Sequence, residues 1–193
     1  MKRKKLKHPF FVIIGPSGSG KTKVAEAVFP LAYKVISHTT RPIRKGEKDG
    51  VDYYFETTKR FELLLNTGAL VEHDTYHGKH YGVGIAELLK KTTDHYAYDV
   101  LTIKGFQEIE KQFGNMVIPI FLKVSKKNVL LRLHARDDDE KIKLQRIALF
   151  DQEIQNKNKV MDYSNYYIID ANQSFENVVN DVKQAVNETV KKG

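Results

Sequence analysis

Residues 10–29 read FFVIIGPSGSGKTKVAEAVF, and this stretch decides the fold. Residues 10–14 are an unbroken run of β-branched and aromatic side chains bounded by a proline and a glycine, which predicts a strand buried on both faces of a parallel sheet. Residues 22–29 predict a helix, because apolar side chains recur at helical spacing until Pro30 ends it. A strand, a glycine-rich turn and a helix in this order predict an α/β fold.

The turn between strand and helix matches the P-loop motif G-x-x-x-x-G-K-[ST] at every fixed position. Its glycines allow the backbone amides to fold around phosphate oxygens, at the positive end of the following helix. Lys21 supplies a mobile charge for the β and γ phosphates, and the Thr22 hydroxyl can complete the coordination of Mg²⁺. The motif therefore predicts ATP and Mg²⁺ as cofactors, held by Gly15, Pro16, Ser17, Gly18, Ser19, Gly20, Lys21 and Thr22.

Further apolar runs continue the α/β alternation along the chain. We expect a three-layer fold with a parallel central sheet, whose later strands lie at residues 35–36, 98–103, 117–124 and 166–169. Helices are expected at residues 61–67, 85–91 after a Tyr81-Gly82 turn, 106–113, 129–150 with an acidic break at 137–140, and 175–190. The predicted organisation is a basic tail at 1–9 and a single domain at 10–193, with a monophosphate-binding lobe at about 37–90 and a helical lid at about 132–150.

Composition narrows the classes of partner. The chain has 193 residues, 41% of them hydrophobic, and a net charge of +8 that favours polyanions such as nucleotides. Part of this charge lies in residues 1–8, a run too short to predict a nucleic-acid interface. The chain has no cysteine, which fits a reducing compartment, and no apolar run of membrane-spanning length. We therefore expect a cytoplasmic protein with small-molecule substrates and no membrane partner.

A second phosphate site is predicted in residues 37–53. Arg41 and Arg44 lie three positions apart beside a proline and can form a fork for one phosphate, and Tyr53 can add a hydroxyl donor. Composition alone leaves open a solvated basic loop.

The same segment resembles the guanylate kinase family, whose pattern S-x-T-T-R-x-x-R-x-G-E-x-x-G-x-D-Y is matched in register from Ser37 to Tyr53. The resemblance extends from about residue 10 to 185. It implies Mg·ATP-dependent phosphoryl transfer to a nucleoside monophosphate, GMP before others. It also implies that Arg41, Arg44, Tyr53 and Tyr81 hold the monophosphate, and that Ser37 and Glu72 read the guanine edge.

The resemblance further implies that Arg136 and Arg146 come from the lid and act with Lys21 and Arg41 as the catalytic cations. Their charge would be worth most as the transferring phosphoryl group develops its transition-state charge. Without the family, both lid arginines could equally be exposed helix charges.

Several positions depart from the family pattern. Val83 stands where the family has a Ser or Thr that contacts the base, and a valine side chain cannot donate. Val100 and Thr102 stand where the family has an Asp-x-Asp pair, so that only a shifted gap lets Asp99 serve. Asp170 replaces the usual Asn near the adenine pocket. These departures leave two alternatives open: a kinase of a phosphosugar such as ribose 1,5-bisphosphate, and a catalytically silent protein-binding module.

Overall fold

The computed structural model describes residues 5–76, 78–134 and 140–192. Its strands are β1 (Phe10–Ile14), β2 (His38–Thr39), β3 (Tyr54–Phe55), β4 (Leu70–Tyr76), β5 (Lys79–Gly84), β6 (Ala97–Val100), β7 (Val117–Lys123) and β8 (Tyr167–Asp170). Its α-helices are α1 (Lys21–Val28), α2 (Thr58–Asn66), α3 (Ile85–Lys91), α4 (Ile103–Phe113), α5 (Lys126–His134), α6 (Glu140–Met161) and α7 (Phe175–Lys192). No helix in the described ranges is both long and apolar enough to span a membrane.

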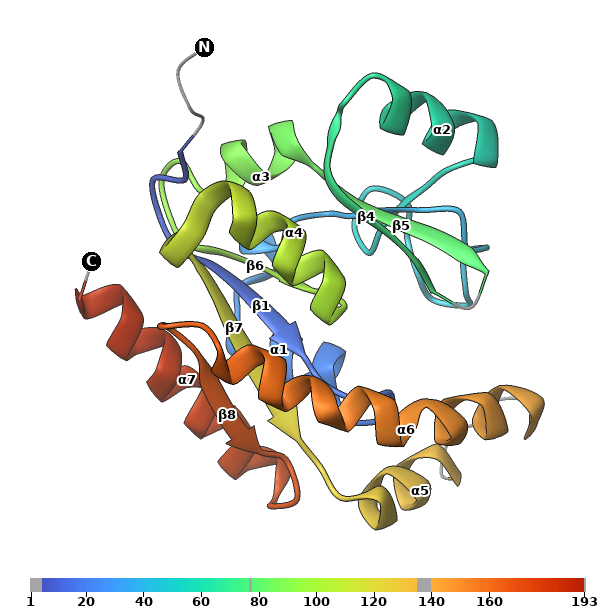
Figure 1. Ribbon diagram of the computed structural model, residues 1–193, viewed down its shortest axis with the longest axis vertical. Helices are drawn as coiled ribbons and strands as arrows, with labels where there is room; N and C mark the ends of the chain where they lie inside the picture. Colours follow the sequence, from blue (N-terminus) through green and yellow to red (C-terminus); the bar gives the residue numbers. More distant parts are fainter. Residues whose placement is uncertain (1–4, 77, 135–139, 193) are drawn as a thin grey trace.

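The main sheet has the strand order β6-β1-β7-β8, and every neighbouring pair is parallel (Figure 1). All five residues of β1 are buried, as expected for a strand covered on both faces. Phe11 and Ile13 belong to a core cluster with side chains of α1 and α7, while Phe10, Val12 and Ile14 belong to a second cluster with side chains of α4. Successive side chains of β1 therefore face two different helical layers, and the expected three-layer α/β fold is confirmed.

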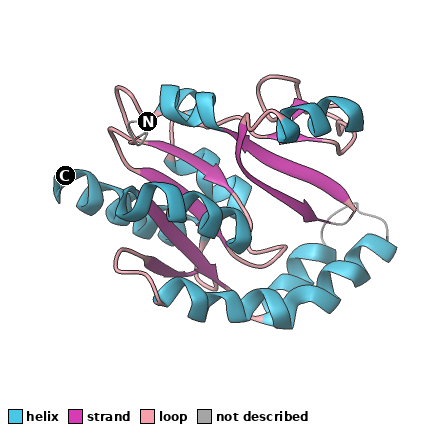
Figure 2. Cartoon of the chain, turned by 45° about the horizontal axis from the view of Figure 1, so that its top comes forward, coloured by secondary structure: helices cyan, strands magenta, loops and turns pink. Residues whose placement is uncertain are grey.

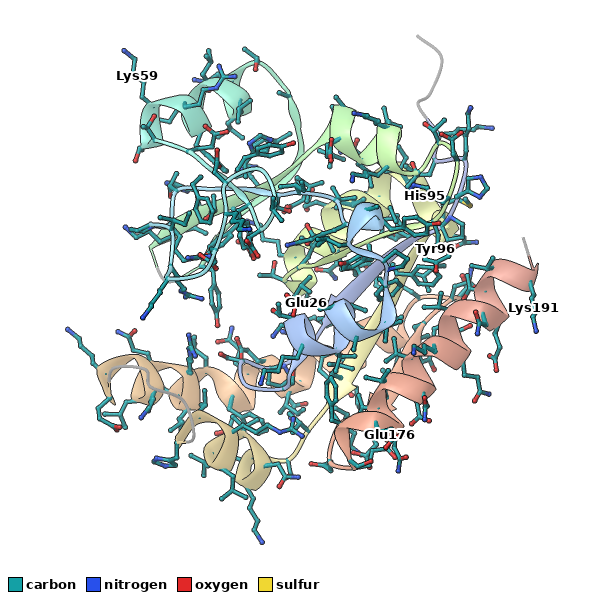
Figure 3. The ribbon with its side chains drawn as sticks, turned by 180° about the vertical axis from the view of Figure 1, so that it is seen from behind. Glu26, Lys59, His95, Tyr96, Glu176 and Lys191 are labelled. Carbon is teal, nitrogen blue, oxygen red and sulfur yellow. The ribbon has the colours of Figure 1, made fainter. Side chains whose placement is uncertain are left out.

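The two helical layers can be followed in the figures. Helices α1 and α7 pack together behind the sheet in Figure 1, and Figure 3 shows them from that side, with Glu176 and Lys191 near the two ends of α7. Helix α4 covers the front of the sheet beside the C-terminal part of α6. This arrangement leaves the carboxyl end of β1, where the glycine-rich turn begins, at the edge that faces the second sheet.

A smaller sheet with the order β3-β2-β5-β4 forms a separate lobe (Figure 2). Strand β5 is antiparallel to both β2 and β4, whereas the short strands β2 and β3 are parallel. Helix α2 packs on this sheet through Phe61, which is 2% exposed and stacks on His80. The irregular segment with short strands that the sequence predicts at 37–55 is therefore present and supplies two strands of the lobe.

Four local expectations were wrong. Helix α6 continues to Met161, past the end expected at residue 150. The strand expected at 98–103 ends at Val100, because the Thr102 hydroxyl accepts a hydrogen bond from the Gly105 amide (3.1 Å) and begins α4. The strand expected at 35–36 is reduced to an isolated bridge between Lys34 and Tyr98. Gly82 lies inside β5 and not in a turn; an added Cβ there would lie 2.9 Å from Leu70 Cδ1, so a close approach requires glycine.

Candidate functional site

The predicted phosphate cradle lies between β1 and α1, with Gly15, Gly18 and Gly20 at positive φ. At Gly15 an added Cβ would lie 2.9 Å from the Leu122 carbonyl oxygen, so the loop passes against the neighbouring strand β7. The Lys21 ammonium donates hydrogen bonds to the carbonyl oxygens of Gly15 (2.7 Å) and Pro16 (3.0 Å). The side chain of Lys21 thus folds back over the start of the loop and holds its charge there.

The cradle also contains a buried hydroxyl that fits a phosphate ligand. Ser19 is 2% exposed, and among the described residues its Oγ has no hydrogen-bond partner. A buried hydroxyl without a partner costs about 1–3 kcal/mol, which a phosphate oxygen at this place would offset. Thr22, in the first turn of α1, is exposed and available to a metal ion carried by the phosphates. The residues present therefore fit the triphosphate and Mg²⁺ that the motif predicts.

The structure brings together three of the four residues predicted to hold the acceptor monophosphate. The Arg41 guanidinium lies 5.4 Å from the centre of the Tyr53 ring, which meets the Tyr81 ring edge-on at 6.1 Å. Glu47 accepts two hydrogen bonds from Arg41, at 2.9 and 2.8 Å. Arg44 is exposed at its side chain, and its backbone N–H donates to the same carboxylate (2.8 Å). Glu47 therefore orients Arg41 within the cluster and links it to Arg44.

Replacing Glu47 by alanine is expected to raise the KM for the acceptor nucleotide about tenfold, with a smaller change in kcat. Burial alone would raise the pKa of Glu47, but the hydrogen bonds from Arg41 and from the Arg44 backbone, together with the charges of both arginines, bring the pKa below its usual value, so the pair is ionic. Losing one such charge-assisted pair is worth about 1.5–3 kcal/mol. Steady-state kinetics measure the effect, with exposed Glu62→Ala on α2 as the control. A lower KM would show that Glu47 instead withholds Arg41 from the substrate.

Ser37 and Glu72, which are predicted to read the base, lie deep between the lobe and the main sheet. Ser37 is 4% exposed and Glu72 5%. The Ser37 hydroxyl donates to Oδ2 of Asp99, a carboxylate at the end of β6 that is itself buried. Gly105 on α4 gives Glu72 its space, since an added Cβ there would lie 3.0 Å from Glu72 Oε2. Asp99 is therefore part of the same constellation as the two predicted residues.

The electrostatics of this constellation are unusual. Burial, and then the nearby carboxylates Asp99 and Asp74, raise the pKa of Glu72 to about 8. Burial also raises the pKa of Asp99 to about 6, although the hydrogen bond from Ser37 and the charge of Lys34 oppose it. Near neutral pH the free protein therefore holds Glu72 mainly as a neutral carboxyl group.

Asp74 is a residue of the site that the sequence analysis missed. It lies two positions after Glu72 on β4, so both side chains project from the same face of the strand. Its Oδ2 accepts from the Thr102 hydroxyl (2.7 Å), and its Oδ1 lies 3.2 Å from the Lys104 ammonium. Burial would raise the pKa of Asp74, but the hydrogen bond from Thr102 and the other donors keep it below its usual value. The alternation Glu72-x-Asp74 in a strand was the available signal.

A second missed contact joins the lobe to the cradle. Glu153 of α6 accepts from the Ser17 backbone N–H at Oε2 (2.8 Å) and from the Tyr76 hydroxyl at Oε1 (3.0 Å). Arg146, a predicted catalytic cation, lies on the same helix and its charge acts on Tyr76. Arg136, the other lid cation, lies outside the described residues. One carboxylate therefore connects the strand that carries Glu72, the phosphate loop and the helix that carries Arg146.

Tyr76→Phe is expected to lower the free energy of unfolding by about 1 kcal/mol, because it removes the hydroxyl that donates to Glu153. Equilibrium urea unfolding measures the change, with Tyr54→Phe on the outer strand β3 as the control. Equal stability of the two variants would mean that the bridge contributes nothing to holding the lobe.

Arg132 of α5 ties the cradle to the turn that follows β8, where the resemblance implies the adenine pocket. Its guanidinium donates to the carbonyl oxygens of Ser19 (3.0 Å) and Ala171 (2.7 Å). Asp170, which precedes Ala171, accepts at Oδ1 from the backbone N–H of Asn172 (3.0 Å) and holds that turn. The aspartate at this position thus has a local structural partner.

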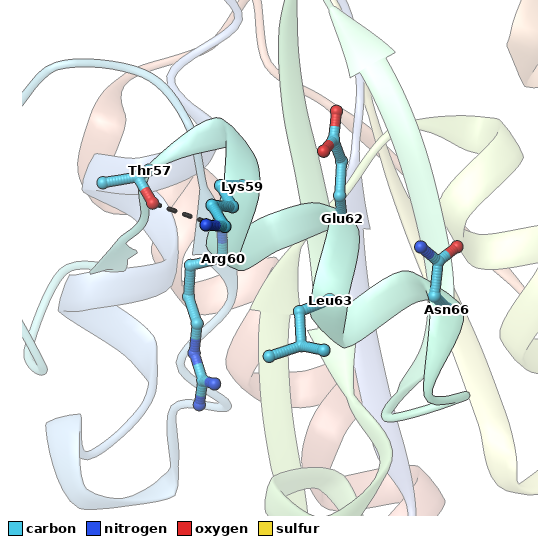
Figure 4. A pocket seen from close by; sticks show the side chains of 6 residues that line it. All are labelled: Thr57, Lys59, Arg60, Glu62, Leu63 and Asn66. Atoms are coloured by element: carbon cyan, nitrogen blue, oxygen red, sulfur yellow. Dashed lines mark hydrogen bonds between the residues drawn. The ribbon is translucent and has the colours of Figure 1, made fainter.

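A surface hollow of about 420 Å³ lies elsewhere, along the outer side of the lobe (Figure 4). The Thr57 hydroxyl accepts from the Arg60 amide there and begins α2. None of its lining residues is a predicted site residue: they are Thr57, Lys59, Arg60, Glu62, Leu63 and Asn66. The hollow is separate from the constellation described above.

Comparisons with known proteins agree with this geometry. Residues 7–189 match the family model described as guanylate kinase. A guanylate kinase of Chlorobium luteolum is 37% identical over 69% of this chain and 71% of its own length. One of Coxiella burnetii is 31% identical over 88% and 82%. The crystal structure of guanylate kinase from Anaplasma phagocytophilum, 24% identical, superposes with a TM-score of 0.69 over 96% of this chain and 88% of that one, which shows a shared fold. The chain therefore belongs to the guanylate kinase family.

Proposed function

We propose that this protein transfers the γ-phosphoryl group of Mg·ATP to GMP. The observation that carries the proposal is the buried carboxyl group of Glu72, held between the lobe and the main sheet on the strand that also reaches the cradle through Tyr76. A carboxylate can accept from both N1–H and the 2-amino group of guanine. The relatives reported above are named guanylate kinases, which supports the same acceptor.

The chain's own groups would act by position and charge. Lys21 would neutralise the β and γ phosphates, Arg41 with Tyr53 and Tyr81 would hold the acceptor phosphate, and Arg146 would add charge from α6. Mg²⁺ would supply Lewis-acid stabilisation of the phosphate oxygens, with the Thr22 hydroxyl as its protein ligand. Phosphoryl transfer of this kind needs no covalent nucleophile from the protein.

A coupled assay of ADP release tests the proposal directly. Mg·ATP is offered with GMP, dGMP, AMP, CMP, UMP or ribose 1-phosphate, and saturable turnover with GMP above the pyrimidine and sugar phosphates is expected. Turnover with ribose phosphates alone would establish the phosphosugar alternative, which Val83 and Thr102 favour. No turnover with any acceptor would support the silent binding module, against which the intact cradle speaks.

A further inference from the structure

Within the described part of the chain, neither position at which the resemblance implies a hydroxyl at the base offers a free O–H donor to the guanine acceptors. Guanine offers O6 and N7 as acceptors, while N1–H and the 2-amino group are donors. Val83, at the position of the family's base-contacting hydroxyl, is fully buried in β5 and pairs with Glu72 across the strands. A valine side chain has no hydrogen-bonding group. The hydroxyl donor that the family has at this position is therefore missing, which leaves Ser37 as the second hydroxyl to consider.

The second hydroxyl is already engaged. Ser37 donates its single proton to Asp99 Oδ2, so that its oxygen faces other partners as an acceptor. Asp99 is held in place in turn: its Oδ1 accepts from the Val100 backbone N–H (2.7 Å), and Lys34 lies close enough to act on its charge. The Ser37 oxygen is therefore suited to an amino group and poorly suited to a carbonyl oxygen.

Hydrogen-bond acceptors for the N1–H and 2-amino side of guanine are still present, but they come from a different strand. Thr102 stands where the family has an aspartate, and its proton is donated to Asp74. A carboxylate is thus restored beside this position, from β4 and not from the strand that normally carries it. Glu72 and Asp74 project from one face of β4, and Asp74 lies near enough to raise the pKa of Glu72.

Resting on the GMP kinase function proposed above, we infer that this chain selects its acceptor by the purine 2-amino group and tolerates either an oxygen or an amino group at C6. Its substrate class is then the 2-aminopurine nucleoside 5′-monophosphates, GMP and 2,6-diaminopurine riboside 5′-monophosphate alike. Asp74 and Glu72 are then the specificity-determining residues.

The protonation of Glu72 is compatible with both substrates. A neutral carboxyl group carries one O–H donor and one carbonyl acceptor, which match the unprotonated N1 and the 2-amino group of diaminopurine. The ionised carboxylate matches N1–H and the 2-amino group of guanine. Because its pKa lies at about 8, the group can adopt either form near neutral pH.

The test compares kcat/KM for GMP, 2,6-diaminopurine riboside 5′-monophosphate, IMP and AMP under one set of conditions. The diaminopurine nucleotide is expected within about tenfold of GMP, and IMP, which lacks the 2-amino group, roughly 10- to 100-fold below GMP. AMP, which also lacks that group, should be as poor as IMP. IMP equal to GMP with no turnover of the diaminopurine nucleotide would overturn the inference.

Two variants locate the effect. Asp74→Asn is expected to bring the GMP:IMP ratio towards one, whereas Val83→Thr should raise the GMP:diaminopurine ratio about tenfold by restoring a donor, with Val83→Ala as its control. An unchanged GMP:IMP ratio in Asp74→Asn would contradict the role of Asp74.

If GMP is not phosphorylated at all, the proposed function fails on its own. Calorimetric binding of the same four nucleotides then decides the inference: preference for the two 2-amino compounds supports it, and equal or reversed affinity rejects it.

Discussion

Lys21→Ala is expected to lower kcat at least about a thousandfold. The ammonium lies over the start of the cradle, bonded to two carbonyl oxygens of the loop, so its charge is already held at the loop that is proposed to bind the β and γ phosphates. Cations placed at a transferring phosphoryl group are worth on the order of 10³–10⁵ in kcat. The coupled ADP assay with saturating GMP measures the loss.

Lys23→Ala is the matched control, because Lys23 lies two residues further along α1 and is exposed. It removes the same charge from the same helix and should change kcat less than twofold. Thermal unfolding of both variants should resemble that of the parent protein. Full turnover by Lys21→Ala would remove the cradle from the mechanism.

Glu72→Gln is expected to lower kcat/KM for GMP and, at alkaline pH, to stabilise the free protein. kcat/KM for GMP should fall on the order of 100-fold, because an amide presents an NH₂ group where the carboxylate accepts. The free protein, however, should become more stable at alkaline pH, since the variant has no charge to bury at this place. Enzymes commonly sacrifice stability at residues that bind substrate in this way.

The pH dependence follows from the raised pKa. In the folded protein the pKa of Glu72 is about 8, against an ordinary value of 4.5, so between these values the folded state keeps a proton that the unfolded state has lost. The free energy of unfolding must therefore fall as pH rises through this window, and the loss is complete above about pH 8. Burial raises this pKa most and Asp99 and Asp74 raise it further, whereas the Val83 backbone N–H and Lys104 lower it, so these effects together set the width of the window.

Urea unfolding from pH 5 to 9 measures this slope. Glu72→Gln should flatten it above about pH 7, because Asp99, with its pKa of about 6, is by then largely ionised. Glu62→Gln, on the exposed side of α2, should leave it unchanged. Parallel pH profiles for Glu72→Gln and the parent protein would show that Glu72 is ionised in the folded state throughout.

The parts of this site that the sequence predicts are those encoded by local patterns. The cradle is a contiguous motif whose glycines have a backbone reason; β1 follows from an unbroken apolar run and α1 from apolar side chains at helical spacing. Residues that meet only through tertiary structure were harder to predict. The sequence admits Asp99 to the site only through a shifted gap, because no local signal places it beside Ser37, 62 positions away. The sequence shows Thr102 only as the replacement of a family aspartate. The packing of α4 against β4 shows that Asp74 lies beside it.

The element boundaries that were wrong have the same origin. Residues 98–103 are apolar enough for a strand, yet a capping hydroxyl at Thr102 turns the chain into α4. Taken alone, Gly82 suggests a turn. It lies within β5, however, where an added Cβ would press on the side chains of Leu70 and Phe61. In both cases a single contact overrides the local pattern.

Two contacts that tie α5 and α6 to the cradle also bear on the position of Arg146. Arg132 donates to the carbonyl oxygen of Ser19, and Glu153 accepts from the amide of Ser17, so α5 and α6 each contact the cradle through one side chain. Arg146 lies seven residues before Glu153, about 10 Å along the helix axis. Since Glu153 also accepts from the Tyr76 hydroxyl of β4, the position of Arg146 is fixed by the same carboxylate that joins the lobe to the phosphate loop.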